Sequence, residues 1–239
     1  MLEAALWGLV TGASLLVGAG VAILLRPGHR AVGLTMAFGA GALIAAVSYE
    51  LVLEGYETSI KGATSGFVTG AFVFYLGDLL IDRRGGAGRK SMKSESGLAG
   101  SASAIVLGTV LDGIPESFVL GASLQADGVV PVAVVVGVFV SNVPEALSAT
   151  TGLREAGWTS SRLLGMWSAV VAVSVVFAAL GWWALDSMDA ATGAVALGFA
   201  GGALLVMLAD TLIPEAFELG GREAGLLTAL GFALGFSLS

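Results

Sequence analysis

Long apolar runs separated by short polar stretches make up nearly the whole chain. Most of these runs reach the about 20 residues that an α-helix needs to cross the hydrocarbon core of a bilayer. The last run is short for that purpose. The pattern predicts an all-α membrane protein with eight transmembrane helices. They are expected at residues 4–25, 31–53, 63–82, 101–124, 129–152, 161–184, 191–217 and 223–239.

The composition agrees with lipid as the surrounding solvent. Of the 239 residues, 56% are hydrophobic and 12% are charged, and the mean hydropathy is +0.91. Soluble globular domains carry about 25% charged residues. The chain has no cysteine, which excludes disulfides and thiolate metal sites. Glu3 stands where a signal peptide would have basic residues, so the first run is expected to be a retained helix.

Basic residues fall almost entirely in alternate loops between the predicted helices. Loops 1, 3, 5 and 7 hold ten of the eleven lysines and arginines, and the other loops hold only Lys61. Basic loops remain in the cytoplasm, so both termini are predicted to be extracytoplasmic and the protein to lie in the cell (inner) membrane. Residues 83–100, rich in Gly, Ser, Arg and Lys, are expected to form a flexible cytoplasmic loop within a single transmembrane domain, residues 1–239. The scattered basic residues do not form a nucleic-acid-binding cluster.

Two pairs of similar segments indicate an internal repeat. Residues 41–57 read GALIAAVSYELVLEGYE and residues 202–218 read GALLVMLADTLIPEAFE, on predicted helices 2 and 7, which run in opposite directions. Residues 112–116 (DGIPE) and 141–145 (SNVPE) form a second pair on helices 4 and 5. Similar segments in opposite orientation predict inverted-topology repeats of the kind found in secondary transporters. Helices 1–3 would correspond to helices 6–8, and helix 4 to helix 5.

Several acidic residues lie inside the apolar segments, where each charge costs about 2.5–3.5 kcal/mol at the helix centre. No lysine or arginine lies deep in a predicted span to pair with them. A bound cation or protons are therefore the candidates that would neutralise the carboxylates. The acids are Glu50, Glu54, Asp78, Asp112, Glu116, Glu145, Asp210 and Glu215.

The spacing of these acids around prolines favours a cation site. Asp112 and Glu116 are four residues apart and share a helix face, as do Asn142 and Glu145, three apart. A proline lacks the backbone N–H that would bind the carbonyl four residues earlier. The prolines at 115, 144 and 214 should thus expose carbonyls to a cavity between kinked helices. Sets of oxygen ligands suit hard cations.

Other polar and aromatic residues have simpler expected roles. Asp78 and Glu54 lie near predicted helix ends, where an interfacial position is typical. His29 lies in the first cytoplasmic loop, where a ligand role is not expected. Tryptophans such as Trp167 are expected to be interfacial anchors.

With these motifs, the chain resembles the ZIP (Zrt-, Irt-like protein) family of divalent metal transporters, as a divergent prokaryotic member. The family has a His-Asn-x-Pro-Glu-Gly type motif on helix 4, where this chain reads DGIPES at residues 112–117. A related motif on helix 5 corresponds to SNVPEA at residues 141–146. Residues 210–215 (DTLIPE) are similar to the family's His-Glu-x-x-Pro-Glu region on helix 7.

The resemblance implies transport of divalent transition-metal cations, with the metal as substrate and no organic cofactor. Glu116 and Glu145 would bridge two ions, and Asp210 would stand where the family often has a transport-site histidine. Glu215 and Glu50 would line the route or relay protons. The implied metal site comprises Asp112, Glu116, Ser141, Asn142, Glu145, Asp210, Glu215 and Glu50.

The chain departs from the family where histidines are replaced by Asp112 and Asp210, and where Gly113 replaces an asparagine. The possible cargo ions are zinc, manganese, iron(II), cobalt and cadmium, and an all-oxygen site should shift the substrate range from strict zinc selectivity toward manganese, iron(II), cobalt or a broad range. The alternative is a proton- or sodium-coupled carrier of a small organic solute. No enzyme motif is present, neither His-Glu-x-x-His nor Gly-x-Ser-x-Gly. Glycine-lined helix faces favour a homodimer.

Overall fold

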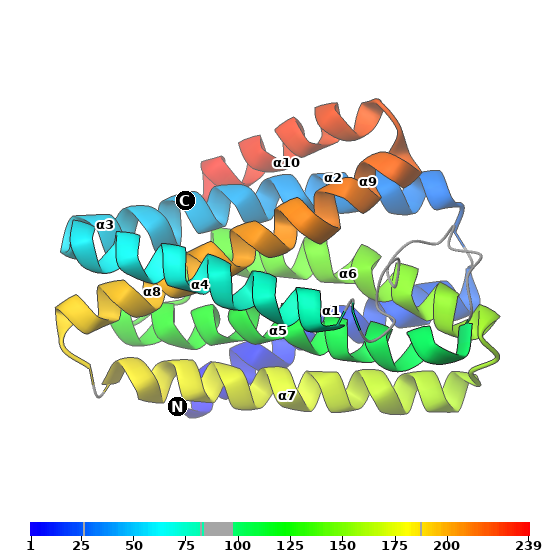
Figure 1. Ribbon diagram of the computed structural model, residues 1–239, viewed down its shortest axis with the longest axis horizontal. Coiled ribbons are helices and arrows are strands. Elements are labelled where there is room, and N and C mark those ends of the chain that lie inside the picture. Colours follow the sequence, from blue (N-terminus) through cyan, green and yellow to red (C-terminus); the bar gives the residue numbers. More distant parts are fainter. Residues whose placement is uncertain (26, 82, 84–97, 187) are drawn as a thin grey trace.

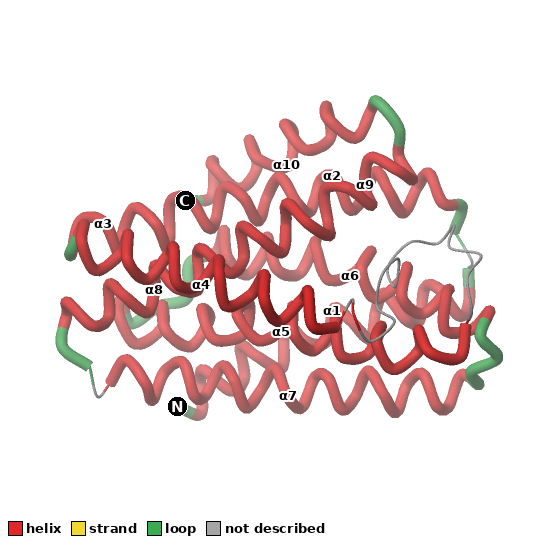
Figure 2. The backbone as a smooth tube through the Cα atoms, in the orientation of Figure 1, coloured by secondary structure: helices red, strands yellow, loops and turns green. Residues whose placement is uncertain are grey.

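The structure is a computed structural model that describes residues 1–25, 27–81, 83, 98–186 and 188–239. Every regular element in this part of the chain is a helix (Figure 2). Most of the helices run roughly along the long axis of the molecule (Figure 1). The elements are α1 (Leu2–Leu24), α2 (His29–Ala46), η1 (Val47–Leu53), α3 (Glu54–Thr58), α4 (Ile60–Ile81), α5 (Leu98–Asp127), α6 (Val132–Glu155), α7 (Ser160–Asp186), α8 (Ala190–Met207), η3 (Leu208–Leu212), α9 (Ile213–Gly220) and α10 (Glu223–Leu238), where η marks a π-helix.

Six helical segments within the described residues are long and apolar enough to cross a membrane. Helices α5 and α10, which cover the other two predicted spans, are not among the six. The all-α class is confirmed, and the six segments indicate that lipid surrounds the protein. They are Leu2–Leu24, His29–Thr58, Ile60–Ile81, Val132–Glu155, Ser160–Asp186 and Ala190–Gly220.

The structure corrects two predicted boundaries. The helix predicted at residues 31–53 continues to Thr58, because α3 follows η1 without a break. Helix α5 begins at Leu98, so the last three residues of the predicted loop 83–100 are helical. The rest of that loop, residues 84–97, lies outside the described residues. So do five of the basic residues used to predict orientation, namely Arg26, Arg84, Arg89, Lys90 and Lys93.

The helices pack mainly as close pairs. Helix α4 lies along α8, α10 along α2, and α5 along α7, while α1 contacts both α6 and α7. Helix α2 also packs on α6 and so joins the α2–α4–α8–α10 helices to the α1–α5–α6–α7 helices. The buried core runs through both groups and consists largely of Ala, Val and Leu.

Glycines permit very close contact between α2 and α10. A Cβ added to Gly41 would collide with the carbonyl oxygen of Thr228, and one added to Gly231 would collide with the carbonyl oxygen of Phe38. Each helix therefore presses a glycine against the backbone of the other. Small residues at helix contacts are common in membranes, where tight packing replaces the hydrophobic effect between helices.

The same arrangement occurs between α8 and α4. A Cβ on Gly202 would collide with the carbonyl oxygen of Phe67, and one on Gly70 would collide with the carbonyl oxygen of Phe199. The two pairs of helices thus use reciprocal contacts of one kind. Substitution of any of these glycines requires the helices to separate.

Two long helical rods each contain a π-helical segment: the first rod is α2–η1–α3 and the second is α8–η3–α9. Segment η1 connects α2 to α3, and η3 connects α8 to α9. In the alignment of residues 41–57 with residues 202–218, the first residues of the two segments, Val47 and Leu208, occupy the same position. Short π-helical turns occur often at functional sites.

Arginines join helix ends at one end of the molecule. Arg30 pairs with Glu223 at 2.7 Å, which links the start of α2 to the start of α10. Arg154 donates to the carbonyls of Ala22 and Ile23 at the end of α1. Both chain termini lie toward the opposite end (Figure 1).

Two residues lie elsewhere than expected. Trp167 is not an interfacial anchor: it is completely buried, and its indole N–H donates to the hydroxyl of Thr150 at 2.8 Å. Asp78 lies in the last turn of α4, near the helix end as predicted, but its side chain is buried. In both cases, packing against neighbouring helices buries a side chain that was expected at the membrane interface.

Candidate cation site on helices α5 and α6

The predicted polar residues of α5 and α6 are buried inside an apolar helix bundle. Asp112 and Glu116 are 1% and 2% exposed, and Glu145 is 6% exposed. Ser141 and Asn142, which precede Glu145 on α6, are buried as well. All five residues predicted from the two motifs are therefore withdrawn from the surface.

Helix α6 is held tightly around its motif by two neighbours. A Cβ on Gly39 of α2 would lie 2.8 Å from the Cα of Ser141, and a Cβ on Gly18 of α1 would collide with the carbonyl oxygen of Val143. This close packing fixes the backbone from which Ser141, Asn142 and Glu145 project. Rigid backbone support of this kind keeps ligand groups in place.

The carbonyl released by Pro144 does not lie where the sequence suggested. Helix α6 continues through Pro144, and the carbonyl oxygen of Val140 lies 2.9 Å from the position of a Cβ on Gly39. That oxygen is thus at the interface with α2 rather than in an open cavity. The difference arises because Gly39 lacks a side chain and lets the two backbones meet.

On α5, the neighbouring residues Pro115 and Glu116 lie in two different environments: Pro115 lines a pocket and Glu116 lies in a narrow space. Pro115 lines an apolar pocket of about 480 Å³ between α4, α5, α7 and α8. Glu116 lies against Leu43, Val138 and Leu204, in a space too narrow for a water molecule. The carboxylate therefore sits in a dry region between α2, α6 and α8, where an unneutralised charge would be costly.

Glu215 is brought to α6 by a hydrogen bond that the sequence did not reveal. The hydroxyl of Ser148 donates to the carboxylate of Glu215, and both side chains are buried. Ser148 follows Glu145 by three residues and so shares its helix face. That spacing could have indicated Ser148 as a site residue, but serine is too common in apolar helices for the spacing alone to identify it.

The other two predicted acids lie in the π-helical segments. Asp210 is exposed on η3, and Glu50 is partly buried in η1. Neither is enclosed in the way that Glu116 is. The π-helical backbone sets the position of both acids.

The described residues contain no group of three or more His, Cys, Asp or Glu side chains close enough to hold one metal ion. Helix α5 packs chiefly on α7, whereas α6 packs chiefly on α1 and α2. A cation held at α5 and α6 would therefore need the hydroxyl of Ser141, the amide of Asn142 or water as further ligands. These are oxygen donors of the type that hard and intermediate divalent cations accept.

Comparison of the chain with known protein families and with curated proteins finds no match in either set. The predicted resemblance to the ZIP family accordingly rests on the sequence motifs at residues 112–117, 141–146 and 210–215 alone.

Proposed function

We propose that this protein carries divalent transition-metal cations, such as zinc, manganese or iron(II), across the cell membrane. The observation that carries the proposal is the burial of Asp112, Glu116 and Glu145 on two apolar helices. Three carboxylates in the interior of a membrane protein are retained at a large desolvation penalty. A divalent cation that passes these carboxylates offsets the penalty through its attraction to their negative charges.

The donor set determines the kind of cation. Glu116 and Glu145 are the primary ligands in this proposal, bridging two ions, and Asp112, Ser141 and Asn142 complete the coordination. All are oxygen donors, which favours a broad range of divalent cations over strict zinc selectivity. Asp210, Glu215 and Glu50 line the route or relay protons.

An inverted repeat and eight spans belong to the same proposal. In the register that aligns residues 41–57 with residues 202–218, the Gly41–Thr228 contact corresponds to the Gly202–Phe67 contact. The two π-helical segments correspond as well. Equivalent contacts at equivalent positions are expected of two copies of one ancestral unit.

The second reciprocal contact follows the same register. Gly231 with Phe38 corresponds to Gly70 with Phe199. Both contacts between α2 and α10 therefore have counterparts between α8 and α4. The repeat supports transport in which one helix group rocks against the other around a central site.

In this proposal the protein crosses the inner membrane eight times, with the arginine-rich end in the cytoplasm. The described arginines Arg30, Arg154 and Arg162 lie at helix ends that gather on one side (Figure 1). Basic residues on one side agree with the positive-inside rule.

Metal uptake by Glu116→Ala and Glu145→Ala variants tests the function. Uptake of zinc, manganese and cobalt into proteoliposomes should fall to background in both variants, while membrane expression stays normal. Glu57→Ala is the matched control, because Glu57 is an exposed acid at the end of α3. Normal uptake in both test variants would refute the assignment. Stabilisation by an organic solute and by no metal would favour the solute carrier.

A further inference from the structure

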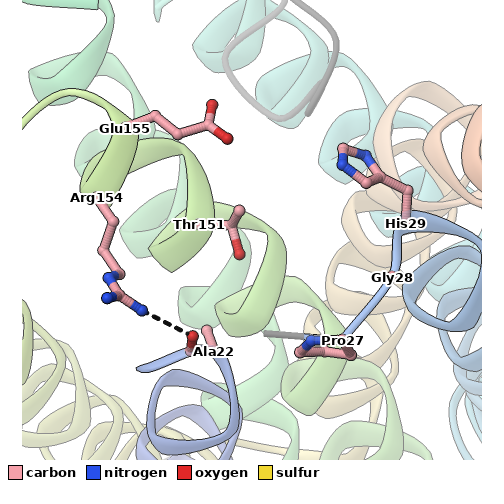
Figure 3. Close-up of a pocket in the computed structure, with 7 residues that line it drawn as sticks. All are labelled: Ala22, Pro27, Gly28, His29, Thr151, Arg154 and Glu155. Carbon is pink, nitrogen blue, oxygen red and sulfur yellow. Dashed lines mark hydrogen bonds between the residues drawn. The ribbon is translucent and has the colours of Figure 1, made fainter. Parts of the chain in front are cut away.

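A pocket with charged and polar side chains among its lining residues opens at the arginine-rich end of the molecule, away from the buried carboxylates. It has a volume of about 450 Å³ and lies between the end of α1, the start of α2 and the end of α6. Figure 3 shows the imidazole of His29 and the carboxylate of Glu155 facing each other across it, with Thr151 on the same helix as Glu155.

The arginine that lines this pocket is already engaged. The guanidinium of Arg154 donates to the carbonyl of Ala22 at 3.0 Å (Figure 3) and to that of Ile23 at 3.2 Å. Arg30, which follows His29, pairs with Glu223. Among the described residues that line the pocket, Glu155 is therefore the acidic one, and the guanidinium of Arg154 is directed at the backbone of α1.

The three facing side chains provide donor atoms for a cation. Thr151 donates its hydroxyl proton to the carbonyl of Leu147 at 2.9 Å, so its oxygen retains lone pairs for another partner. His29 and Glu155 make no hydrogen bond or ion pair with the described residues. A neutral imidazole, a carboxylate and a hydroxyl together form a nitrogen and oxygen donor set.

One face of α6 connects this pocket to the candidate cation site. Glu145, Ser148, Thr151 and Glu155 follow one another at intervals of three or four residues, so they lie along one stripe of the helix. Glu215 joins the stripe through its bond from Ser148. Oxygen atoms thus recur at each turn of α6 between the buried carboxylates and the pocket.

We propose that His29 and Glu155, with Thr151, form a second binding site for a divalent transition-metal cation at the mouth of the transport route. The inference rests on the proposed function for its role in transport, because the site would receive or deliver the cation that passes Glu145. Unlike the buried site, this ligand set includes an imidazole nitrogen, and it has one carboxylate. It therefore suits cations of intermediate softness, such as zinc and cobalt, better than magnesium.

The test uses the fact that the chain has a single histidine. Full-length protein without a polyhistidine tag, labelled with ¹³C and ¹⁵N at histidine, gives imidazole NMR signals from His29 alone. Zinc is titrated at pH 7.5 into the wild-type protein, Glu155→Gln, and Glu57→Gln as control. A fourth sample carries Glu116→Ala and Glu145→Ala together.

Zinc should shift the imidazole signals of the wild-type protein and of the Glu57→Gln control at the same concentrations. In Glu155→Gln the midpoint should rise about tenfold, which corresponds to the loss of one ligand contact. The shift should persist in the double variant, because the pocket lies at the end of α6 and not at the buried carboxylates.

Three results would overturn the inference: no shift in the wild-type protein, the same midpoint in Glu155→Gln, or a shift caused by inorganic phosphate instead of zinc. The first two would leave the proposed function intact if uptake still required Glu116 and Glu145. Conversely, uptake that survives in the double variant would refute the proposed function even if His29 binds zinc.

Discussion

The rods α2–η1–α3 and α8–η3–α9 share a backbone plan but differ in the surroundings of their acids. Each presses a glycine against an outer helix and then passes through a π-helical segment that starts at the same aligned position. Glu54 and Glu215 are also aligned. Glu215 is buried and accepts a hydrogen bond from Ser148, whereas Glu54 is only partly buried.

The difference teaches that the shared backbone positions an acid in both rods, while neighbouring helices decide its environment. Helix α6 supplies Ser148 to Glu215. Of the two aligned acids, the proposed mechanism therefore places Glu215 of the second rod on the transport route and gives Glu54 of the first rod no direct part in it. The predictions below test this division, from the largest effect to the smallest.

Removing the shared backbone contact should have the largest effect. Gly41→Val and Gly202→Val would each place a side chain into a helix backbone, at Thr228 and Phe67. Each should lower the free energy of unfolding by about 3 kcal/mol, at the high end for overpacking. Thermal unfolding in detergent measures the loss.

The control for this pair is Gly193→Ala on α8, where nothing lies within 4 Å of an added Cβ. This variant should be unchanged or more stable by up to about 1 kcal/mol, since alanine favours a helix. Equal stability of Gly41→Val, Gly202→Val and the control would show that the close contacts do not hold the rods.

Replacing each of the two aligned acids with alanine should affect metal uptake to different extents in the two rods. Glu215→Ala should reduce metal uptake by about 10- to 100-fold, as expected when a supporting group beside a metal route is lost. Glu54→Ala should reduce uptake much less, because its carboxylate is less enclosed. Initial uptake rates at matched expression give the ratio, and equal losses would contradict the division.

The hydrogen bond that distinguishes the second rod can be removed alone. Ser148→Ala should destabilise the protein by about 1–3 kcal/mol, because it leaves the buried carboxylate of Glu215 with one donor fewer. Ser123→Ala is the control, since the Ser123 hydroxyl is buried and has no hydrogen-bond partner among the described residues. A cost in Ser123→Ala as large as in Ser148→Ala would argue against a special role for the bond.

Replacing the acids of the π-helical segments, Asp210 and Glu50, with histidine should have the smallest effect, a change in the ratio of zinc to manganese uptake. Asp210→His should raise zinc uptake relative to manganese uptake by about twofold to fivefold, since imidazole is a softer ligand than carboxylate. Glu50→His, in the other rod, should change the ratio less. Competition between the two metals in one uptake assay measures it, and a larger change with Glu50→His would reverse the comparison.

The sequence predicted the helical class and most helix positions because long apolar runs leave few alternatives in lipid. It also identified the buried acids of α5 and α6 correctly as interior residues. These features depend on composition and periodicity within one segment. The boundary of α5 at Leu98 was missed because polar residues precede the apolar run.

Features that depend on contact between helices could not be predicted. The bond from Ser148 to Glu215 joins residues distant in sequence, and so does the burial of Trp167 against Thr150. The carbonyl of Val140 was expected in a cavity, but Gly39 of α2 covers it. A proline indicates which carbonyl is released, whereas only the packing shows what the carbonyl then faces.

The π-helical segments have a consequence for the geometry of both rods. A π-helical turn holds one more residue than an α-helical turn, so side chains beyond it are rotated in phase by about 100°. In the first rod, Gly41 contacts α10 before η1, and Leu51 within η1 lies beside Glu116 and Leu204. Leu43, before η1, also lines that space, and the extra residue of the π-helical turn keeps Leu43 and Leu51, eight residues apart, on one face of the rod. Deletion of one residue from η1 would therefore rotate the side chains beyond it by about 100° relative to those before it and would take Leu51 out of line with Leu43.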